Sequence, residues 1–139
     1  MLFRSHVRAI GLGSSVKFPN SDNIRHMVYS LSGAKKFELP LYIGKEAPAV
    51  VFDNAGLVTL GCNIHDKMQG FIRVTTTPYA ARTDGNGLAA IEGLGRGNHD
   101  TVVWHPRIRA PGGEWRGKLT MEPGNRLRIV VAVRPGAAR

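Results

Sequence analysis

The sequence predicts an all-β protein of two segments, residues 1–76 and 77–139. Apolar residues alternate with polar ones over short runs, as on strands with one buried face. The 17 Gly and 8 Pro residues favour many turns, and no stretch has a helical pattern of useful length. With 139 residues, of which 42% are hydrophobic and 21% charged, the chain can form one domain or two small ones, with a buried core.

In the first segment, short alternating runs flank dense turn signals such as Pro19-Asn20-Ser21-Asp22-Asn23. His26 and Val28 are expected on one face of a strand, because successive side chains of a strand point to opposite faces. The same period places Val58, Leu60 and Cys62 together, so the thiol is expected on the core side. The expected extended runs are residues 13–18, 26–30, 50–52, 57–62 and 70–75.

In the second segment, residues 83–87 are expected to form a tight turn. Strands are predicted over residues 88–94 and 101–104, and a loop over residues 109–117. A last strand is predicted from an alternating apolar face on residues 127–133. That face consists of Leu127, Ile129, Val131 and Val133.

The net charge is +9, and it is spread evenly along the chain. Nine basic and five acidic residues give +4 in residues 1–76, and ten and five give +5 in residues 77–139. This excess indicates an acidic partner or an anionic surface. No nucleic-acid motif and no alternation of aromatic and basic residues accompanies it, so nucleic acid is the less favoured partner.

The sequence also predicts where the protein is found. No run approaches the roughly 18 apolar residues that span a bilayer. The start, Met1-Leu2-Phe3-Arg4-Ser5-His6, leads into polar sequence without the apolar region of a secretory signal. A cytoplasmic location is therefore expected if this start is genuine.

The strongest functional signal lies in residues 62–68. Cys62 is the single cysteine, so it has no internal disulfide partner, and His65 and Met68 follow it at intervals of three residues. Soft, redox-active copper prefers such ligands, and blue-copper sites combine two His and one Cys with a distant axial Met. His26 lies upstream to supply the second His. The sequence thus predicts a site for one copper ion, Cu(I)/Cu(II), at His26, Cys62, His65 and Met68.

Other roles for these residues are less favoured but stay open. A free cysteine such as Cys62 is often a plain buried thiol, and Met68 could serve in core packing. A Cys–His nucleophile is disfavoured because cysteine hydrolases take their His from far away in the sequence. Zinc prefers more Cys or His ligands, and a c-type haem needs Cys-x-x-Cys-His, which the sequence lacks.

The arrangement His26…Cys62-x-x-His65-x-x-Met68 resembles the cupredoxins, the plastocyanin- and azurin-like blue copper proteins, and its spacing is closest to amicyanin. The flanking segments 13–20, 52–62 and 70–74 are similar to the family's strands around the ligands. Segments 18–22, 37–42 and 61–66 resemble a bacterial cupredoxin-like group of methylamine utilization proteins. The resemblance covers roughly Val7 to Trp104.

This resemblance implies a Greek-key β-sandwich in which His26, Cys62 and His65 are equatorial ligands and Met68 is axial. It implies a carrier of single electrons, not an enzyme, with a protein redox partner. The net positive charge favours a partner with an acidic docking surface. The family's location is the periplasm. Two departures stand out: Met27 follows the first His in place of the more usual Asn or His, and the usual first strand is expected to be missing.

The second segment resembles a small prealbumin-like or carboxypeptidase-regulatory-like β unit. Residues 83–85, Gly97 and residues 102–106 are the basis of this similarity. Such units support or bind and rarely catalyse. Two other functions remain open for the whole chain: a non-redox β-sandwich module that binds or stores copper, and a basic binder of nucleic acid or anionic surfaces.

Overall fold

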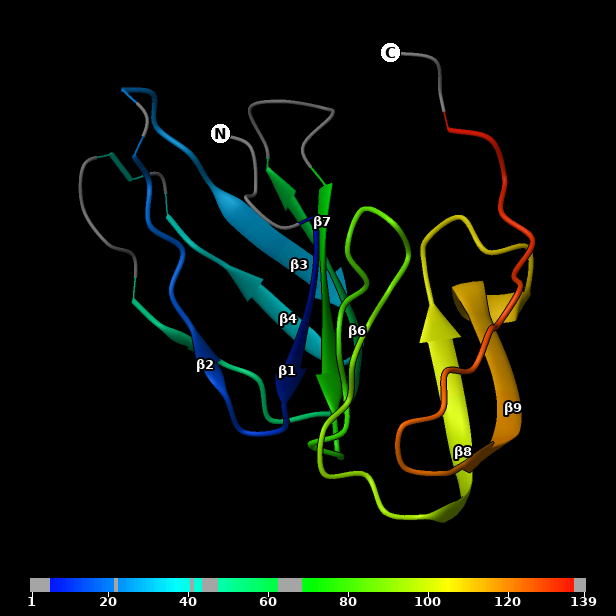
Figure 1. The fold of residues 1–139 in the computed structure, drawn as a ribbon. Coiled ribbons are helices and arrows are strands. Elements are labelled where there is room, and N and C mark those ends of the chain that lie inside the picture. The colour runs from blue at the N-terminus through cyan, green and yellow to red at the C-terminus, as the bar shows by residue number, and fades with distance from the viewer. Residues whose placement is uncertain (1–5, 22, 41, 44–47, 63–68, 137–139) are drawn as a thin grey trace. The chain divides into compact units, whose positions relative to one another are not determined.

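The computed structural model describes residues 6–21, 23–40, 42–43, 48–62 and 69–136 (Figure 1). The chain divides into two compact units, Met1–Ile91 and Glu92–Arg139. Within the described residues the regular structure consists of nine β-strands and one three-residue 3₁₀ helix. The predicted all-β class is therefore confirmed. None of the described residues belongs to a helix with the length and apolar character needed to cross a bilayer.

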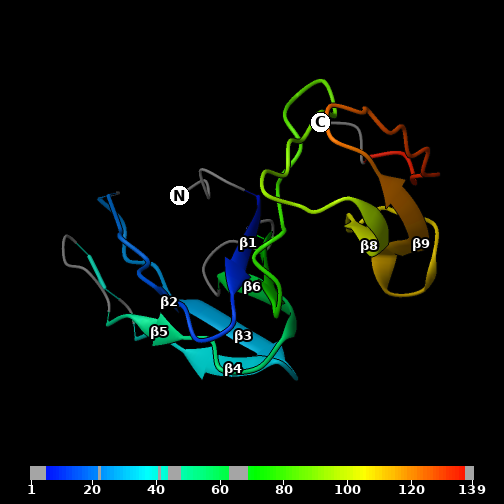
Figure 2. The same ribbon diagram turned by 60° about the horizontal axis from the view of Figure 1, so that its bottom comes forward.

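The first unit contains a five-stranded mixed sheet with the strand order β1-β7-β6-β3-β4. The strands are β1 (Val7–Gly11), β3 (Val28–Ser32), β4 (Lys35–Glu38), β6 (Gly56–Cys62) and β7 (Gln69–Thr75). Neighbouring strands are antiparallel except β1 and β7, which run parallel. Two shorter strands, β2 (Ser15–Val16) and β5 (Val50–Val51), pair antiparallel in a second small sheet (Figure 2).

The hydrophobic core of this unit joins the two sheets. Val58 and Leu60 of β6 are buried in it together with Phe18 and Phe52, which follow the short strands β2 and β5. Strand β6 alternates buried and partly buried residues along its length, and its last residue, Cys62, is buried. The prediction that Val58, Leu60 and Cys62 share the core face is confirmed. The remaining core residues are Val28, Leu39, Ile72 and Val74.

The expectation that the usual first strand is missing is wrong, because β1 lies near the start of the first unit. It occupies one edge of the large sheet, with Val7 opposite Phe71 and Gly11 opposite Thr75. Only Val7 and Ile10 are partly buried, and the three residues with them are exposed. Because this pattern lacks a period of two, the alternation that predicts strands elsewhere gives no signal here. The strand is defined by its backbone pairing with β7.

The second unit is built on a β-hairpin of β8 (Gly97–Trp104) and β9 (Glu114–Met121). The predicted strand over residues 101–104 is confirmed as the end of β8. Residues 105–113 join the two strands and include the 3₁₀ helix η1 (Pro111–Gly113). The predicted loop over residues 109–117 is wrong in its second half, because β9 begins at Glu114.

Two strand predictions in the second segment are wrong. Residues 88–94 contain no strand, and Leu88 and Ile91 are exposed. Residues 127–133 make only an isolated bridge, between Ile108 and Val133. Within the described part of the chain, this run has no neighbouring strand to bury its apolar face, and Leu127 and Val133 of that face are each 44% exposed. Alternation alone therefore did not make a strand there.

Candidate metal centre

Two of the four predicted ligands, His26 and Cys62, meet in the interior of the first unit. The His26 Nδ1 atom lies 3.8 Å from the Cys62 Sγ atom, although 36 residues separate them in the sequence. The His26 side chain is fully buried, and Cys62 is 6% exposed. Cys62 ends strand β6 directly opposite Val28 of β3. Since His26 precedes Val28 by two residues, the expected shared face of His26 and Val28 turns the imidazole toward the thiol.

The separation of these two atoms fits a shared metal ion. Metal–sulfur and metal–nitrogen bonds of about 2.3 and 2.0 Å, lengths typical of zinc, that meet at about 120° place the two ligand atoms about 3.7 Å apart. The observed 3.8 Å matches this spacing and is also compatible with a long S–H···N hydrogen bond. A thiol and an imidazole are among the donors that copper accepts. The pair therefore fits half of a blue-copper ligand set.

The backbone at His26 is fixed by an antiparallel bridge to Tyr42. The His26 N–H donates to the Tyr42 carbonyl at 3.2 Å, and the Tyr42 N–H donates to the His26 carbonyl at the same distance. The Asn20 side chain reinforces this bridge. Its Nδ2 group donates to the Tyr42 carbonyl at 2.8 Å and to the Ile24 carbonyl at 2.9 Å. Asn20 thus links the turn before His26 to the segment that pairs with it.

Tyr42 extends the same network with its phenol. The Tyr42 hydroxyl donates to the Phe18 carbonyl at 2.6 Å, next to the core. Burial raises the pKa of the Tyr42 phenol, and the negative charge of the Cys62 thiolate raises it further. Both influences keep the phenol protonated, so it remains the donor in this hydrogen bond. The segment that pairs with His26 is thereby tied to the core at Phe18.

On the other side of β6, Gly61 allows close packing against Tyr29. The two residues face each other in the register of β3 and β6. A Cβ atom at Gly61 would lie 2.8 Å from the Tyr29 Cζ atom, closer than carbon atoms approach without displacement. The absence of a side chain at residue 61 therefore lets the Tyr29 ring lie over the strand next to Cys62.

The other two predicted ligands, His65 and Met68, lie outside the described residues, so the structure gives no position for them. Met27 is half-buried beside His26. Among the described residues, no group of three or more His, Cys, Asp or Glu side chains is close enough to hold a metal ion. The described part of the centre is therefore the His26–Cys62 pair with its supporting network.

Sequence reasoning missed Asn20 and Tyr42. Asn20 belongs to a dense turn signal, and in that context an asparagine predicts a turn residue, not a buried donor. Tyr42 comes shortly after Pro40, a residue that interrupts strand patterns. No local pattern distinguishes either residue, because the bond from Asn20 to the Tyr42 carbonyl and the bond from Tyr42 to the Phe18 carbonyl join segments about 20 residues apart.

No family model matches this sequence, and no curated protein matches it. Among solved structures, two reduced variants of amicyanin are similar, one of them described as a Cu(I) form at pH 4. Each has a TM-score of 0.48 and 23% sequence identity. Each alignment covers 54% of this chain and 74% of the amicyanin chain.

Proposed function

We propose that this protein binds one copper ion through His26, Cys62, His65 and Met68 and carries single electrons between protein redox partners. The observation that supports this proposal is the approach of two buried donors, His26 Nδ1 and Cys62 Sγ, to 3.8 Å. A bound copper ion supplies the chemistry, because it takes up or releases one electron as it alternates between Cu(I) and Cu(II).

The protein's own contribution is a fixed and water-poor ligand pair. Cys62 acts as a thiolate, the form in which cysteine binds metals. The bridge to Tyr42 and the Asn20 amide hold the His26 backbone in place. Cys62 ends strand β6, and His26 lies in an isolated bridge to Tyr42. Ligands fixed by backbone pairing and by a second layer of hydrogen bonds keep one geometry in both oxidation states. Little then has to move when an electron passes, which suits a carrier and needs no substrate pocket.

The partner in this proposal is a redox protein with an acidic docking surface. The net charge of +9 favours such a partner, since opposite charges accelerate encounter. By resemblance to the cupredoxins, we propose the periplasm as the compartment. An electron-transfer rate that falls steeply with ionic strength would support an acidic partner.

Copper reconstitution tests the proposal directly. Titration of the purified protein with Cu(II) should reach one equivalent and produce the intense visible absorption of a thiolate–copper bond. Cys62→Ser and His26→Gln should both lose this absorption. His99→Gln is the matched control, because its ring contacts the Gly95 carbonyl in the second unit, and it should keep both stoichiometry and colour. A colourless one-to-one Cu(II) complex of the unmodified protein would refute the proposal.

The axial role of Met68 has a separate test. Met68→Leu should keep the colour and raise the reduction potential, because it removes a weak donor and leaves the three strong ones. Redox titration of the copper-loaded variant measures this change. If Met68→Leu prevents copper binding altogether, the axial assignment is wrong.

A further inference from the structure

Residues 126–131 of the second unit form an extended run that does not belong to a sheet. The chain has no turn or bend from Asn125 to Ala132, and Figure 1 shows this part as a coil between β9 and the C-terminus. No backbone hydrogen bond joins residues 126–131 to any other described residue. At the rise of a β-strand, six residues span roughly 20 Å, the length of an ordinary strand. The run therefore has the length of a strand but no pairing strand in the described part of the chain.

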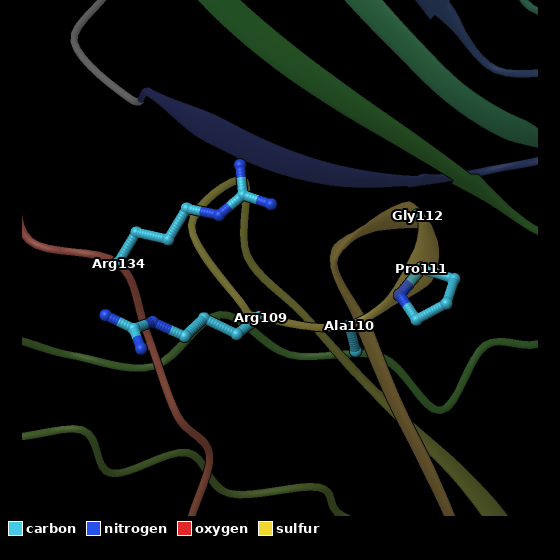
Figure 3. A pocket seen from close by; sticks show the side chains of 5 residues that line it. All are labelled: Arg109, Ala110, Pro111, Gly112 and Arg134. Atoms are coloured by element: carbon cyan, nitrogen blue, oxygen red, sulfur yellow. The ribbon is translucent and has the colours of Figure 1, made fainter.

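The C-terminal end of the run is anchored by a short backbone pairing. The Arg109 N–H donates to the Ala132 carbonyl at 2.8 Å, and the Arg134 N–H donates to the Arg107 carbonyl at 2.7 Å. Figure 3 shows Arg134 beside Arg109, with their side chains extended past each other. The peptide groups of an extended chain alternate in direction. Because those of residues 132 and 134 face residues 107–109, the odd-numbered residues before them present their N–H and C=O groups to the opposite, free edge.

The side chains of the run alternate as on a strand with one covered face. Ile129 and Val131 are half-buried, whereas Arg128 and Val130 are exposed. An edge that is already extended and covered on one face needs little ordering before another strand pairs with it. Such pairing would supply hydrogen-bond partners to backbone groups that no described residue satisfies.

The exposed face of the run is basic. Arg126, Arg128 and Arg134 are exposed, and no acidic residue follows Glu122 in the sequence. None of these three arginines has a carboxylate within ion-pairing distance among the described residues. A second copy of the chain, paired on this edge, would bring three more arginines against these, and opposed like charges are unfavourable. An acidic strand would instead place carboxylates across from the guanidinium groups.

We propose that residues 126–131 bind an extended acidic segment of a partner protein, which adds to their free edge as a β-strand. Main-chain hydrogen bonds supply the affinity, and carboxylates on alternate residues of the segment pair with Arg126 and Arg128 and supply the specificity. Nucleic acid fits this edge less well, because its phosphates accept hydrogen bonds but donate none to the carbonyl groups. The site is independent of the proposed copper centre, whose described residues lie in the first unit.

A blocked peptide of alternating glutamate and valine is the probe for this site. Its binding to the full-length protein is followed by fluorescence anisotropy, and amide hydrogen exchange of the complex is measured by mass spectrometry. We expect one peptide per chain and slower exchange at residues 126–131. A peptide of alternating lysine and valine should bind at least about tenfold more weakly, because its charge is of the wrong sign. Unchanged exchange at residues 126–131, or equal binding of the two peptides, would overturn the proposal.

Two pairs of variants separate the backbone contribution from the charge contribution. Ile129→Pro removes an N–H group of the free edge, and Ile129→Ala is its control because it loses the same side chain but keeps the N–H; the proline variant should bind at least about fivefold more weakly. Arg126→Gln/Arg128→Gln should lose about tenfold in affinity. Its control, Arg8→Gln/Arg82→Gln, removes the same charge from two exposed arginines of the first unit and should bind as the unmodified protein does.

Equal binding within either pair of variants would contradict strand addition at this edge. Displacement of the peptide by single-stranded oligodeoxythymidine at a similar concentration would identify nucleic acid as the ligand and would also overturn the proposal. The far-ultraviolet circular dichroism of each variant verifies that the fold is retained. If Ile129→Pro does not fold, a probe with N-methylated amides removes the same hydrogen bonds from the peptide side. This probe should then fail to bind, and its undiminished binding would refute the pairing.

Discussion

Replacement of Asn20 by alanine should show how much the hydrogen bonds around His26 contribute to the metal centre, because Asn20 supports His26 but is not itself a proposed ligand. Asn20 is 7% exposed, and its amide donates to the carbonyls of Ile24 and Tyr42. The variant removes both hydrogen bonds but leaves every proposed copper ligand in the sequence. Its effect therefore reports on how firmly the His26 segment must be held.

The expected size of this effect follows from the two described hydrogen bonds of Asn20. An intramolecular hydrogen bond contributes about 0.5–1.5 kcal/mol to stability, so the loss of two costs about 1–3 kcal/mol. The upper part of this range would require both carbonyls to be left without a partner. The Tyr42 carbonyl still accepts from the His26 N–H, so we expect about 1–2 kcal/mol. At a urea dependence of about 1–3 kcal/mol per molar, the midpoint should fall by roughly 0.3–2 M.

Urea unfolding by far-ultraviolet circular dichroism measures the stability change in the copper-free protein. Asn86→Ala is the matched control, because it makes the same chemical change on an exposed turn of the same unit, and its midpoint should stay unchanged. In the copper-loaded protein, Asn20→Ala should alter the visible and paramagnetic resonance spectra while it keeps one copper per chain. An unchanged midpoint together with unchanged spectra would show that the Asn20 bonds do not position His26.

Three further changes give distinct outcomes. Gly61→Ala should destabilise the first unit by about 1 kcal/mol in urea unfolding, the lower end of the overpacking range, because its Cβ atom displaces the far end of the partly buried Tyr29 ring. Phe52→Ala should cost about 3–5 kcal/mol in the same assay, since this ring is fully buried in the core. The hydrogen bond from Lys35 lowers the pKa of Asp53. The stability that this hydrogen bond contributes is therefore present above the unfolded-state pKa of Asp53 and is lost as the pH falls through its folded-state pKa. The melting temperature of Asp53→Asn should therefore approach that of the unmodified protein in acid and lie below it at neutral pH.

The core of the first unit could be predicted from the sequence because its strands alternate. Val58, Leu60 and Cys62 lie on the buried face of β6 as the period of two requires. Strand β1 could not be predicted in this way. It is an edge strand with only two partly buried residues, and its position depends on pairing with β7, some 60 residues later.

The second unit shows the opposite failure, in which alternation was present but no strand formed. The run of residues 127–133 has a regular apolar face, yet it bridges only at Val133. A strand needs a neighbour for its backbone groups and a surface to cover its apolar side. In the described part of this unit, β8 and β9 pair with each other alone. Alternation with a period of two is thus a condition for a strand with a buried face, but the strand forms only where a neighbouring strand pairs with it.

The difference between local sequence patterns and long-range pairing also explains which parts of the metal centre could be predicted. The meeting of His26 with Cys62 follows from two local facts, the shared face of His26 with Val28 and the inward direction of Cys62, once β3 and β6 are neighbours. The hydrogen bonds of Asn20 to the Tyr42 carbonyl and of Tyr42 to the Phe18 carbonyl follow from no local pattern, because each depends on which distant carbonyl the fold places opposite the donor. Donor residues for a metal can thus be recognised by type and spacing, whereas the residues that hold them in place become visible only when the chain is folded.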